Sequence, residues 1–123
     1  MPIHGVHPDA TPVYGPYTPL VHDGSQFWMS GQIGIDGGAD LASQTRRALE
    51  KIDTLLERAG IPKANIVMAQ VLMTDMNGYD EMNAIYLDWI QDAPVRPARA
   101  AYAVAALPKG ALIEIVVQGK VVA

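Results

Sequence analysis

The N-terminal part of the chain alternates between proline-containing and apolar stretches. Residues 1–13 carry Pro2, Pro8 and Pro12, which predicts an extended lead-in. Two apolar runs follow at 17–22 and 27–33, and the Asp23-Gly24-Ser25 turn between them predicts a β-hairpin. A further turn is predicted at Asp36-Gly37-Gly38.

From residue 41 the apolar period becomes helical. The apolar stripe of the first helix, over 41–59, consists of Leu41, Thr45, Ala48, Leu49, Ile52, Leu55, Leu56 and Ala59. Gly60 follows as a C-terminal cap, with Pro62 just beyond it. After a strand at 66–74, Asn77 is the expected cap of a second helix, whose stripe is Met82, Ile85, Tyr86, Trp89 and Ile90.

Pro94 and Pro97 end the second helix, and two strands are expected after it. They span 98–104 and 112–117, with a turn at 107–110 between them. The predicted order is therefore β-β-α-β-α-β-β in a single domain, 1–123. This order is typical of an α+β fold in which two helices pack on one face of a mixed β-sheet.

The predicted strands are apolar on both faces. In the strand at 66–74 we expect Val67, Ala69, Val71 and Met73 to lie under the helices. The opposite face carries Ile66, Met68, Gln70 and Leu72. The last strand likewise presents Ile113, Ile115, Val117 and Val121 on one face, and Glu114, Val116 and Gln118 on the other. Two helices cover only one sheet face, so we expect the second face to be buried against other copies of the chain.

Composition narrows the choice of function class. The chain of 123 residues is half apolar and has no cysteine, which excludes disulfides and thiolate nucleophiles. It shows neither a signal-peptide pattern nor an apolar run long enough for a membrane helix, so we expect a soluble cytoplasmic protein. The net charge is −4, and Arg46-Arg47 is the one basic pair, which does not favour a nucleic-acid partner.

Two charged residues stand out in the C-terminal strands, Arg99 and Glu114. A buried charge is costly unless it is paired or used. An arginine grips a carboxylate with two donors, and a carboxylate orients or deprotonates a water. One interpretation is therefore a pocket for an organic acid with water chemistry beside it. The alternative is structural: Arg99 caps carbonyls or pairs with an acid, although a 107–110 hairpin would bring Glu114 closer to Val104 than to Arg99.

Other chemistry finds little support in the sequence. The histidines are His4, His7 and His22, and no third ligand keeps metal spacing with the first two. Gly37-Gly38 lacks the flanking pattern of a phosphate loop or a dinucleotide fingerprint. We therefore expect no metal and no cofactor.

Several short motifs resemble the reactive intermediate deaminase (Rid, or YjgF) family. They are Gly15-Pro16-Tyr17, Ser30-Gly31-Gln32-Ile33, Asn83-Ala84-Ile85-Tyr86, Pro97-Ala98-Arg99, Leu107-Pro108-Lys109-Gly110 and Ile113-Glu114-Ile115, and they span most of the chain. The resemblance implies a chorismate-mutase-like fold and a homotrimer with a central barrel and clefts between subunits.

The same resemblance implies roles for individual residues. Arg99 would bind a carboxylate and Glu114 would position the attacking water. The remaining substrate-binding positions would be Tyr17, Ser30, Gly31, Asn83 and the backbone N–H of Ala101. Three of these have a structural alternative: Tyr17 as a lid on the core, Ser30-Gly31 as an ordinary strand end with a glycine at a bulge, and Asn83 as a hydrogen-bonding partner of a neighbouring loop or subunit.

This chain departs from the family pattern at several positions. Ala101 stands where many members have a cysteine, which rules out thiol chemistry there. The segment between Ile35 and Leu41 is short, Pro19 replaces a common polar residue, and Arg96 stands where a bulky apolar residue is usual. Arg96 would add a second positive charge near the mouth of the cleft.

The function expected from this resemblance is hydrolysis of 2-aminoacrylate-type enamines and 2-imino acids to 2-keto acids and ammonia. The alternative is a non-catalytic trimer that binds small carboxylates or regulates a partner. A third function attached to the family is ribonuclease activity or inhibition of translation. The acidic charge and the absence of a histidine acid–base pair on predicted structured elements count against this third function.

Overall fold

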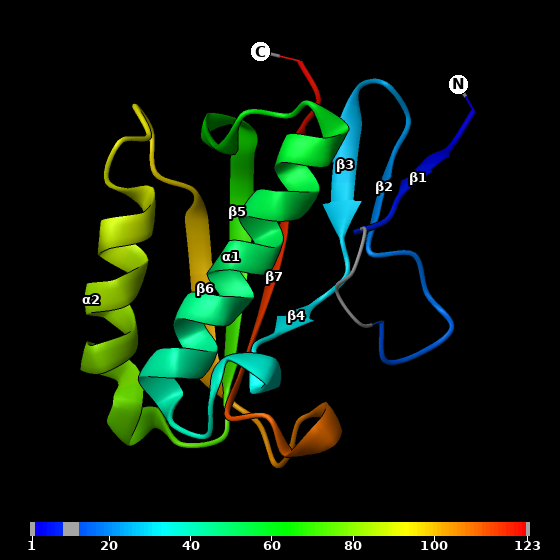
Figure 1. Ribbon diagram of the computed structural model, residues 1–123. Coiled ribbons are helices and arrows are strands. Elements are labelled where there is room, and N and C mark those ends of the chain that lie inside the picture. Colours follow the sequence, from blue (N-terminus) through cyan, green and yellow to red (C-terminus); the bar gives the residue numbers. More distant parts are fainter. Residues whose placement is uncertain (1, 9–12, 123) are drawn as a thin grey trace.

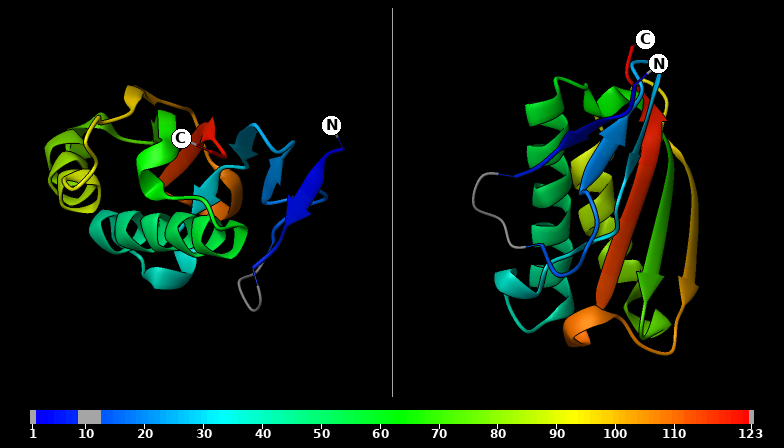
Figure 2. Two further views of the ribbon diagram at one scale, coloured as in Figure 1. Left: turned by 90° about the horizontal axis from the view of Figure 1, so that it is seen from above. Right: turned by 90° about the vertical axis from the view of Figure 1, so that its right-hand side faces the viewer.

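The computed structural model describes residues 2–8 and 13–122. In this part of the chain, two α-helices pack against one face of a seven-stranded sheet (Figures 1 and 2). The helices are α1 (Leu41–Ala59) and α2 (Tyr79–Ile90). In order across the sheet, the strands are β1 (His4–Val6), β2 (Leu20–His22), β3 (Gln26–Met29), β7 (Ile113–Lys120), β5 (Ile66–Met73) and β6 (Ala98–Ala103), while β4 (Gln32–Ile33) also pairs with β7. The predicted α+β fold, a mixed sheet with two helices on one face, is confirmed.

The N-terminal strands differ in detail from the prediction. The lead-in contains β1, which pairs with β2 in antiparallel register, so that His4 lies opposite His22; residues 1 and 9–12 of the lead-in lie outside the described residues. The run at 27–33 is divided at Ser30-Gly31 into β3 and β4. Both strands pair with β7. At the interruption, Gly31 lies against the side chain of Glu114 on β7.

Helix α1 is stabilised by burial of its apolar stripe against the core. Thr45, Ala48 and Ile52 are fully buried. Gly60 ends the helix with φ of 71°, the left-handed conformation that glycine adopts without strain, and its N–H bonds to the carbonyl of Glu57.

The start of α2 corrects one prediction. Asn77 is not the cap of this helix, because it lies within a 3-10 turn over Met76–Gly78. The carboxylate of Asp75 caps this turn instead, accepting a bond from the N–H of Asn77 at 2.9 Å. A short acidic side chain thus satisfies the first free donors of the helical segment.

The two C-terminal strands do not form a hairpin. Strand β6 pairs in parallel with β5, while β7 pairs with the other side of β5 in antiparallel orientation. A parallel pair needs a long crossover, and α2 supplies it between β5 and β6. The 3-10 turn η4 (Pro108–Gly110) therefore carries the chain past β5 instead of joining neighbouring strands.

The core lies between the sheet and the helices. It contains the predicted residues Ala69, Val71 and Met73 from β5 together with Ile113, Ile115 and Val117 from β7. Val67 was expected in this row but is 48% exposed, while Ile66 is buried. The cause is an irregularity in the pairing of β5 with β7 between Ile66 and Met68, which reverses the alternation at the start of β5.

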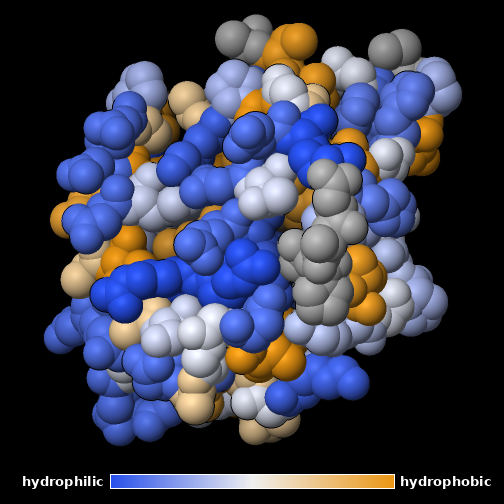
Figure 3. All heavy atoms as spheres, in the orientation of Figure 1, coloured by the Kyte–Doolittle hydropathy of each residue, from blue (hydrophilic) through white to orange (hydrophobic). Residues whose placement is uncertain are grey.

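Within residues 2–8 and 13–122, no helix covers the opposite face of the sheet (Figure 2). Large apolar side chains on the strands are exposed, including Tyr102 at 43% and Trp28 at 41%. The helix side, by contrast, is largely hydrophilic (Figure 3). Among the described residues, neither helix has the length and apolar character needed to cross a bilayer.

Candidate functional site

Arg99 lies on the edge strand β6, on the sheet face that carries the helices. Its register partner is Ala69, a core residue, so its side chain extends from the helix-covered face toward α2. The guanidinium stacks over two rings of α2, with its carbon 4.9 Å from the centroid of Tyr86 and 5.6 Å from that of Tyr79. It also donates a 3.0 Å hydrogen bond to the Tyr79 hydroxyl. These contacts hold the arginine without neutralising it.

Arg99 contributes to a cleft of about 360 Å³ between α2 and the segment that leads into β6. The cleft is lined by Asn83, Tyr86, Leu87, Ile90, Arg96, Pro97 and Arg99. Asn83, which the sequence analysis singled out, is thus brought beside Arg99. No acidic residue lines this cleft, and in the described part of the chain no carboxylate forms an ion pair with Arg99. A guanidinium in this setting is suited to binding an anion.

The aromatic residues around Arg99 are electrostatically coupled to it. A hydrogen bond with Asn83, followed by the charge and the hydrogen bond of Arg99, lowers the pKa of Tyr79. Burial raises the pKa of Tyr86, although the charge of Arg99 opposes this effect. From the sequence, Tyr86 is predicted only as a member of the apolar stripe, and Tyr79 is not a candidate. Tyr79, Met82 and Tyr86 are three and four residues apart, so they lie on one side of α2. This spacing is the sequence signal that could have indicated a helix face able to pack against an arginine of a neighbouring strand.

Ala101 faces the same way as Arg99, two residues further along β6. Its side chain is partly buried against the core, opposite Val71. A larger side chain at this position would meet the helix layer.

Glu114 lies on β7, opposite Leu72 of β5 and Ile33 of β4. Its carboxylate packs directly against Gly31, and a methyl group on that glycine would overlap the Glu114 side chain. This close approach explains the glycine and the break between β3 and β4. Burial raises the pKa of Glu114 above its ordinary value of 4.5. A half-buried carboxylate with a raised pKa is suited to accepting a proton from water.

Ser30 and Tyr17 belong to the same region as Glu114. The Ser30 hydroxyl donates to the carbonyl of Thr18 at 2.8 Å, and its N–H bonds to the carbonyl of Pro19. These two bonds fasten the loop that carries Tyr17 beside Ser30-Gly31. Tyr17 itself precedes β2 in an irregular segment and is 43% exposed. Its ring is therefore available to line a cleft.

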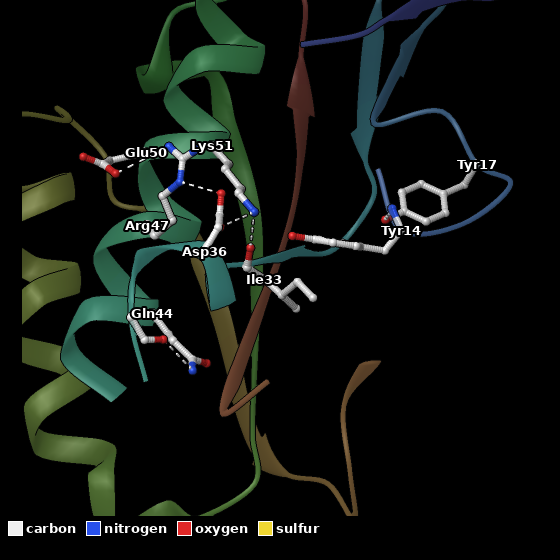
Figure 4. A network of polar contacts seen from close by, with 9 residues as sticks. Tyr14, Tyr17, Ile33, Asp36, Gln44, Arg47, Glu50 and Lys51 are labelled. Carbon is white, nitrogen blue, oxygen red and sulfur yellow. Dashed lines mark hydrogen bonds and ion pairs between the residues drawn. The ribbon is translucent and has the colours of Figure 1, made fainter. Parts of the chain in front are cut away.

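A buried lysine fixes the strand that faces Glu114 (Figure 4). The Lys51 side chain is 3% exposed and donates at 2.7 Å to the carbonyl of Ile33, the residue opposite Glu114 in the sheet. The same ammonium pairs with Asp36 at 2.8 Å, and Asp36 also pairs with Arg47 at 3.2 Å. Burial alone would raise the pKa of Asp36, but hydrogen bonds and charge attraction from Lys51 and Arg47 lower it overall. The burial of Lys51 is not predictable from the sequence, because a lysine inside an amphipathic helix normally faces water.

The candidate residues thus form two separate groups within one chain. Arg99, Asn83 and Ala101 lie toward the helix side, at the β6 edge of the sheet. Glu114, with Gly31, Ser30 and the Tyr17 loop, lies at β7 and β4. The alternative in which Glu114 is a structural partner of Arg99 across a hairpin is excluded, because β5 lies between their strands.

The histidines correct another expectation. His4 and His22 stack on the paired strands β1 and β2, with ring centroids 5.2 Å apart, so a histidine pair does lie on structured elements. The pair is at the sheet edge opposite to Arg99. Within residues 2–8 and 13–122, no group of three or more His, Asp or Glu side chains is arranged to hold a metal ion.

Comparison with known proteins adds to this geometry. The sequence profile of the family described as Endoribonuclease L-PSP matches residues 8–121. Among curated proteins, the chain is 38% identical over 107 residues to a Bos taurus 2-iminobutanoate/2-iminopropanoate deaminase, covering 82% of this chain and 77% of that protein. It is also 38% identical over 109 residues to a RutC family protein of Sulfurisphaera tokodaii, covering 84% of this chain and 86% of that protein.

Solved structures show the same fold. A Yersinia pestis protein of the conserved Rid protein family superimposes with a TM-score of 0.89 at 35% identity, covering 98% of this chain and all of that one. The crystal structure of E. coli TdcF with bound serine gives a TM-score of 0.88 at 28% identity, covering 95% of this chain and 98% of that one.

Proposed function

The chain belongs to the Rid (YjgF, endoribonuclease L-PSP) family, and on that basis we propose that it hydrolyses 2-imino acids, and the enamines that tautomerise to them, to 2-keto acids and ammonia. The observation that carries this proposal is the state of Arg99. Its guanidinium lies against the rings of Tyr79 and Tyr86 and lines a cleft to which no carboxylate contributes. A 2-imino acid has the carboxylate that this arginine lacks.

We further propose that the complete site forms between subunits of a homotrimer. The motive is the separation of Arg99 from Glu114 in one chain, where their side chains leave opposite faces of the sheet. The exposed apolar side chains on the open face supply a surface for association. Packing that face against a neighbouring copy would bring Glu114 of one subunit toward the β6 edge and Arg99 of the next.

In the proposed reaction, Arg99 binds the substrate carboxylate with two parallel donors and so fixes the adjacent imine carbon. Asn83 and the backbone at Ala101 complete this half of the site. On the other half, Glu114 orients a water and accepts its proton as the water oxygen bonds to the imine carbon. Glu114 returns this proton to the imine nitrogen, which gives a tetrahedral carbinolamine. The hydroxyl proton of the carbinolamine then moves to the nitrogen, the C–N bond breaks as the C=O bond forms, and ammonia leaves. Water is the only co-reactant, and no electrons are gained or lost.

The environment of Glu114 supports its role. Burial raises the pKa of this carboxyl, so its conjugate acid is a weaker acid and its carboxylate a better base than an exposed glutamate. The contact with Gly31 restricts the side chain, which would hold the water in one place. Lys51 supports the same region through its bond to the Ile33 carbonyl.

The alternative is that the trimer binds keto acids or other small carboxylates without turnover. Both functions use Arg99, and they differ only in the role of Glu114. Ribonuclease activity, which the family description names, would need a basic surface, whereas this chain has a net charge of −4.

The test is a competition assay. 2-Iminobutyrate is generated in situ by threonine dehydratase, and semicarbazide traps the imine before water hydrolyses it. An active deaminase converts the imine first to the keto acid, which reacts with semicarbazide more slowly, so the initial rate of semicarbazone formation falls as protein is added. If this rate is unchanged for every imino acid tried while 2-ketobutyrate binds, the protein is a binder and the proposal fails.

A further inference from the structure

The cleft that holds Arg99 contains a second arginine. Arg96, which precedes Pro97 in the chain, lines the same cleft. Its side chain is exposed, and in the described part of the chain it forms no hydrogen bond or ion pair. The protein has 13 acidic residues against nine basic ones, yet the lining of this cleft is positive only.

Two like charges in one cleft repel each other unless an anion lies between them or close to both. One carboxylate, bound by Arg99 in two-point fashion, leaves Arg96 unused. A ligand with a second anionic group would satisfy both guanidinium groups. Arg96 is exposed, whereas Arg99 is held against the rings of α2, so the two arginines of this cleft suit the two ends of one short molecule.

The surface between the arginines suits a short carbon chain. It is formed by Tyr86, Leu87, Ile90 and Pro97, whose side chains are largely apolar. The Tyr86 side chain is 7% exposed, and its hydroxyl is buried beneath this surface without a hydrogen-bond partner in the described residues. Tyr86 therefore contributes its apolar ring to the lining of the cleft.

We propose that the cleft selects 2-imino acids that carry a second carboxylate, as do the imines of acidic amino acids. Arg99 binds the carboxylate next to the imine carbon, Arg96 binds the distal carboxylate, and the chain between them lies on Leu87 and Pro97. The product is a 2-keto dicarboxylic acid. This inference rests on the proposed function for turnover, but the selectivity itself is a property of binding and is measured separately.

The decisive measurement is a ratio. The imine of aspartate or glutamate is generated by D-aspartate oxidase and that of 2-aminobutyrate by D-amino-acid oxidase, and kcat/KM is measured by competition with semicarbazide. In parallel, calorimetry gives Kd for 2-ketoglutarate and for 2-ketobutyrate. We expect the wild type to prefer the dicarboxylate in both assays. In Arg96→Gln the preference should fall about fivefold to tenfold, the lower part of the range for a charged hydrogen bond because Arg96 is partly solvated.

Arg46→Gln is the matched control. It removes the same charge from an exposed position on α1, outside this cleft, so the preference should stay as in the wild type. Raising the salt concentration should reduce the preference of the wild type more than that of Arg96→Gln, because salt screens an exposed charge.

The inference is overturned if the wild type does not prefer the dicarboxylate, or if Arg96→Gln keeps the wild-type preference. It is also overturned if the Arg96→Gln trimer dissociates, because Arg96 would then be a subunit contact. If the wild type hydrolyses neither imine, the proposed function fails. The ratio of the two keto-acid Kd values then still decides whether Arg96 reads a second carboxylate.

Discussion

Arg99 and Glu114 lie on opposite faces of one sheet, on strands that both border β5. Arg99 aligns with Ala69 and Val117, both in the core under the helices, whereas Glu114 aligns with Leu72. Leu72 is three residues beyond Ala69, an odd number, so its row of side chains points the other way. The offset along the strands is roughly 10 Å. Within one chain these two residues therefore cannot act on one small substrate.

The first prediction concerns the arginine. Arg99→Ala should reduce kcat/KM for imine hydrolysis tenfold or more, since a hydrogen bond to a charged group is worth about 1.5–3 kcal/mol. Arg99→Lys keeps the charge but loses the planar fork and its stacking on the rings of Tyr79 and Tyr86, so it should recover only part of the loss. Wild-type activity in a folded, trimeric Arg99→Ala would mean that the carboxylate is bound elsewhere.

The second prediction concerns Glu114 as a base. Glu114→Gln should still bind 2-ketobutyrate through Arg99 but hydrolyse 2-iminobutyrate about 100-fold more slowly. In the wild type, kcat/KM should fall on the acid side as Glu114 becomes protonated. Because burial raises its pKa, this fall should begin at a higher pH than the ordinary value of 4.5 would give, and the acid limb should be absent from Glu114→Gln.

Stability provides the control for that variant. A carboxyl whose pKa is raised in the folded state contributes stability below its unfolded pKa, and this stability is lost as the pH rises through the folded pKa. At neutral pH the ionised Glu114 therefore destabilises the fold, and Glu114→Gln should unfold at a temperature no lower than the wild type. A clearly lower unfolding temperature would mean that Glu114 has a structural partner.

The third prediction couples Gly31 to Glu114. Gly31→Ala places a methyl group against the Glu114 carboxylate and should lower both activity and unfolding temperature. Glu114→Ala removes the obstacle, so the double variant should recover stability but not activity. The readout is a double-mutant cycle in thermal or urea unfolding, where contact predicts a coupling of about 0.5–3 kcal/mol. Additive effects would show that the two side chains do not touch in solution.

The fourth prediction concerns the buried lysine. Lys51→Met removes the bond to the Ile33 carbonyl and leaves Asp36 paired only with Arg47. Breaking a fully buried pair costs about 3–5 kcal/mol, and since Asp36 is partly exposed we expect about 2–3 kcal/mol from urea unfolding. Arg47→Met, which removes a more exposed partner of the same carboxylate, should cost about 1 kcal/mol or less. Equal costs would contradict the role given to Lys51.

The sequence predicted what depends on local patterns. The helix at 41–59 and its Gly60 cap, the strand at 66–74 and the helix-covered core residues Ala69, Val71 and Met73 all follow from hydrophobic period and turn chemistry, and they are confirmed. The prediction of Asn77 as a cap is wrong because the short 3-10 turn between Asp75 and α2 leaves no distinctive pattern in the sequence.

Long-range pairing was beyond the local pattern. Two strands joined by a turn at 107–110 are typical of a hairpin. In the structure, α2 returns the chain to the start of the sheet, so that β6 pairs in parallel with one side of β5 while β7 pairs with the other side. The exposure of Val67 could not be predicted either, since an irregularity in strand pairing leaves no signature in one sequence. The same limit hid the cradle of Tyr79 and Tyr86 around Arg99, because it requires knowing which helix face meets the β6 edge.

Subunit mixing tests the central claim, a site shared between neighbouring copies, most directly. Arg99→Ala and Glu114→Gln chains are co-expressed with different tags, and mixed trimers are purified through both tags. In a three-fold ring, any mixed trimer contains one cleft in which an intact Arg99 faces an intact Glu114, so about one third of wild-type activity should return. Each parent trimer alone should keep no more than about a tenth of wild-type activity, as the first two predictions require. Mixed trimers no more active than their parents would show that both residues must come from the same chain, and the shared site would be wrong.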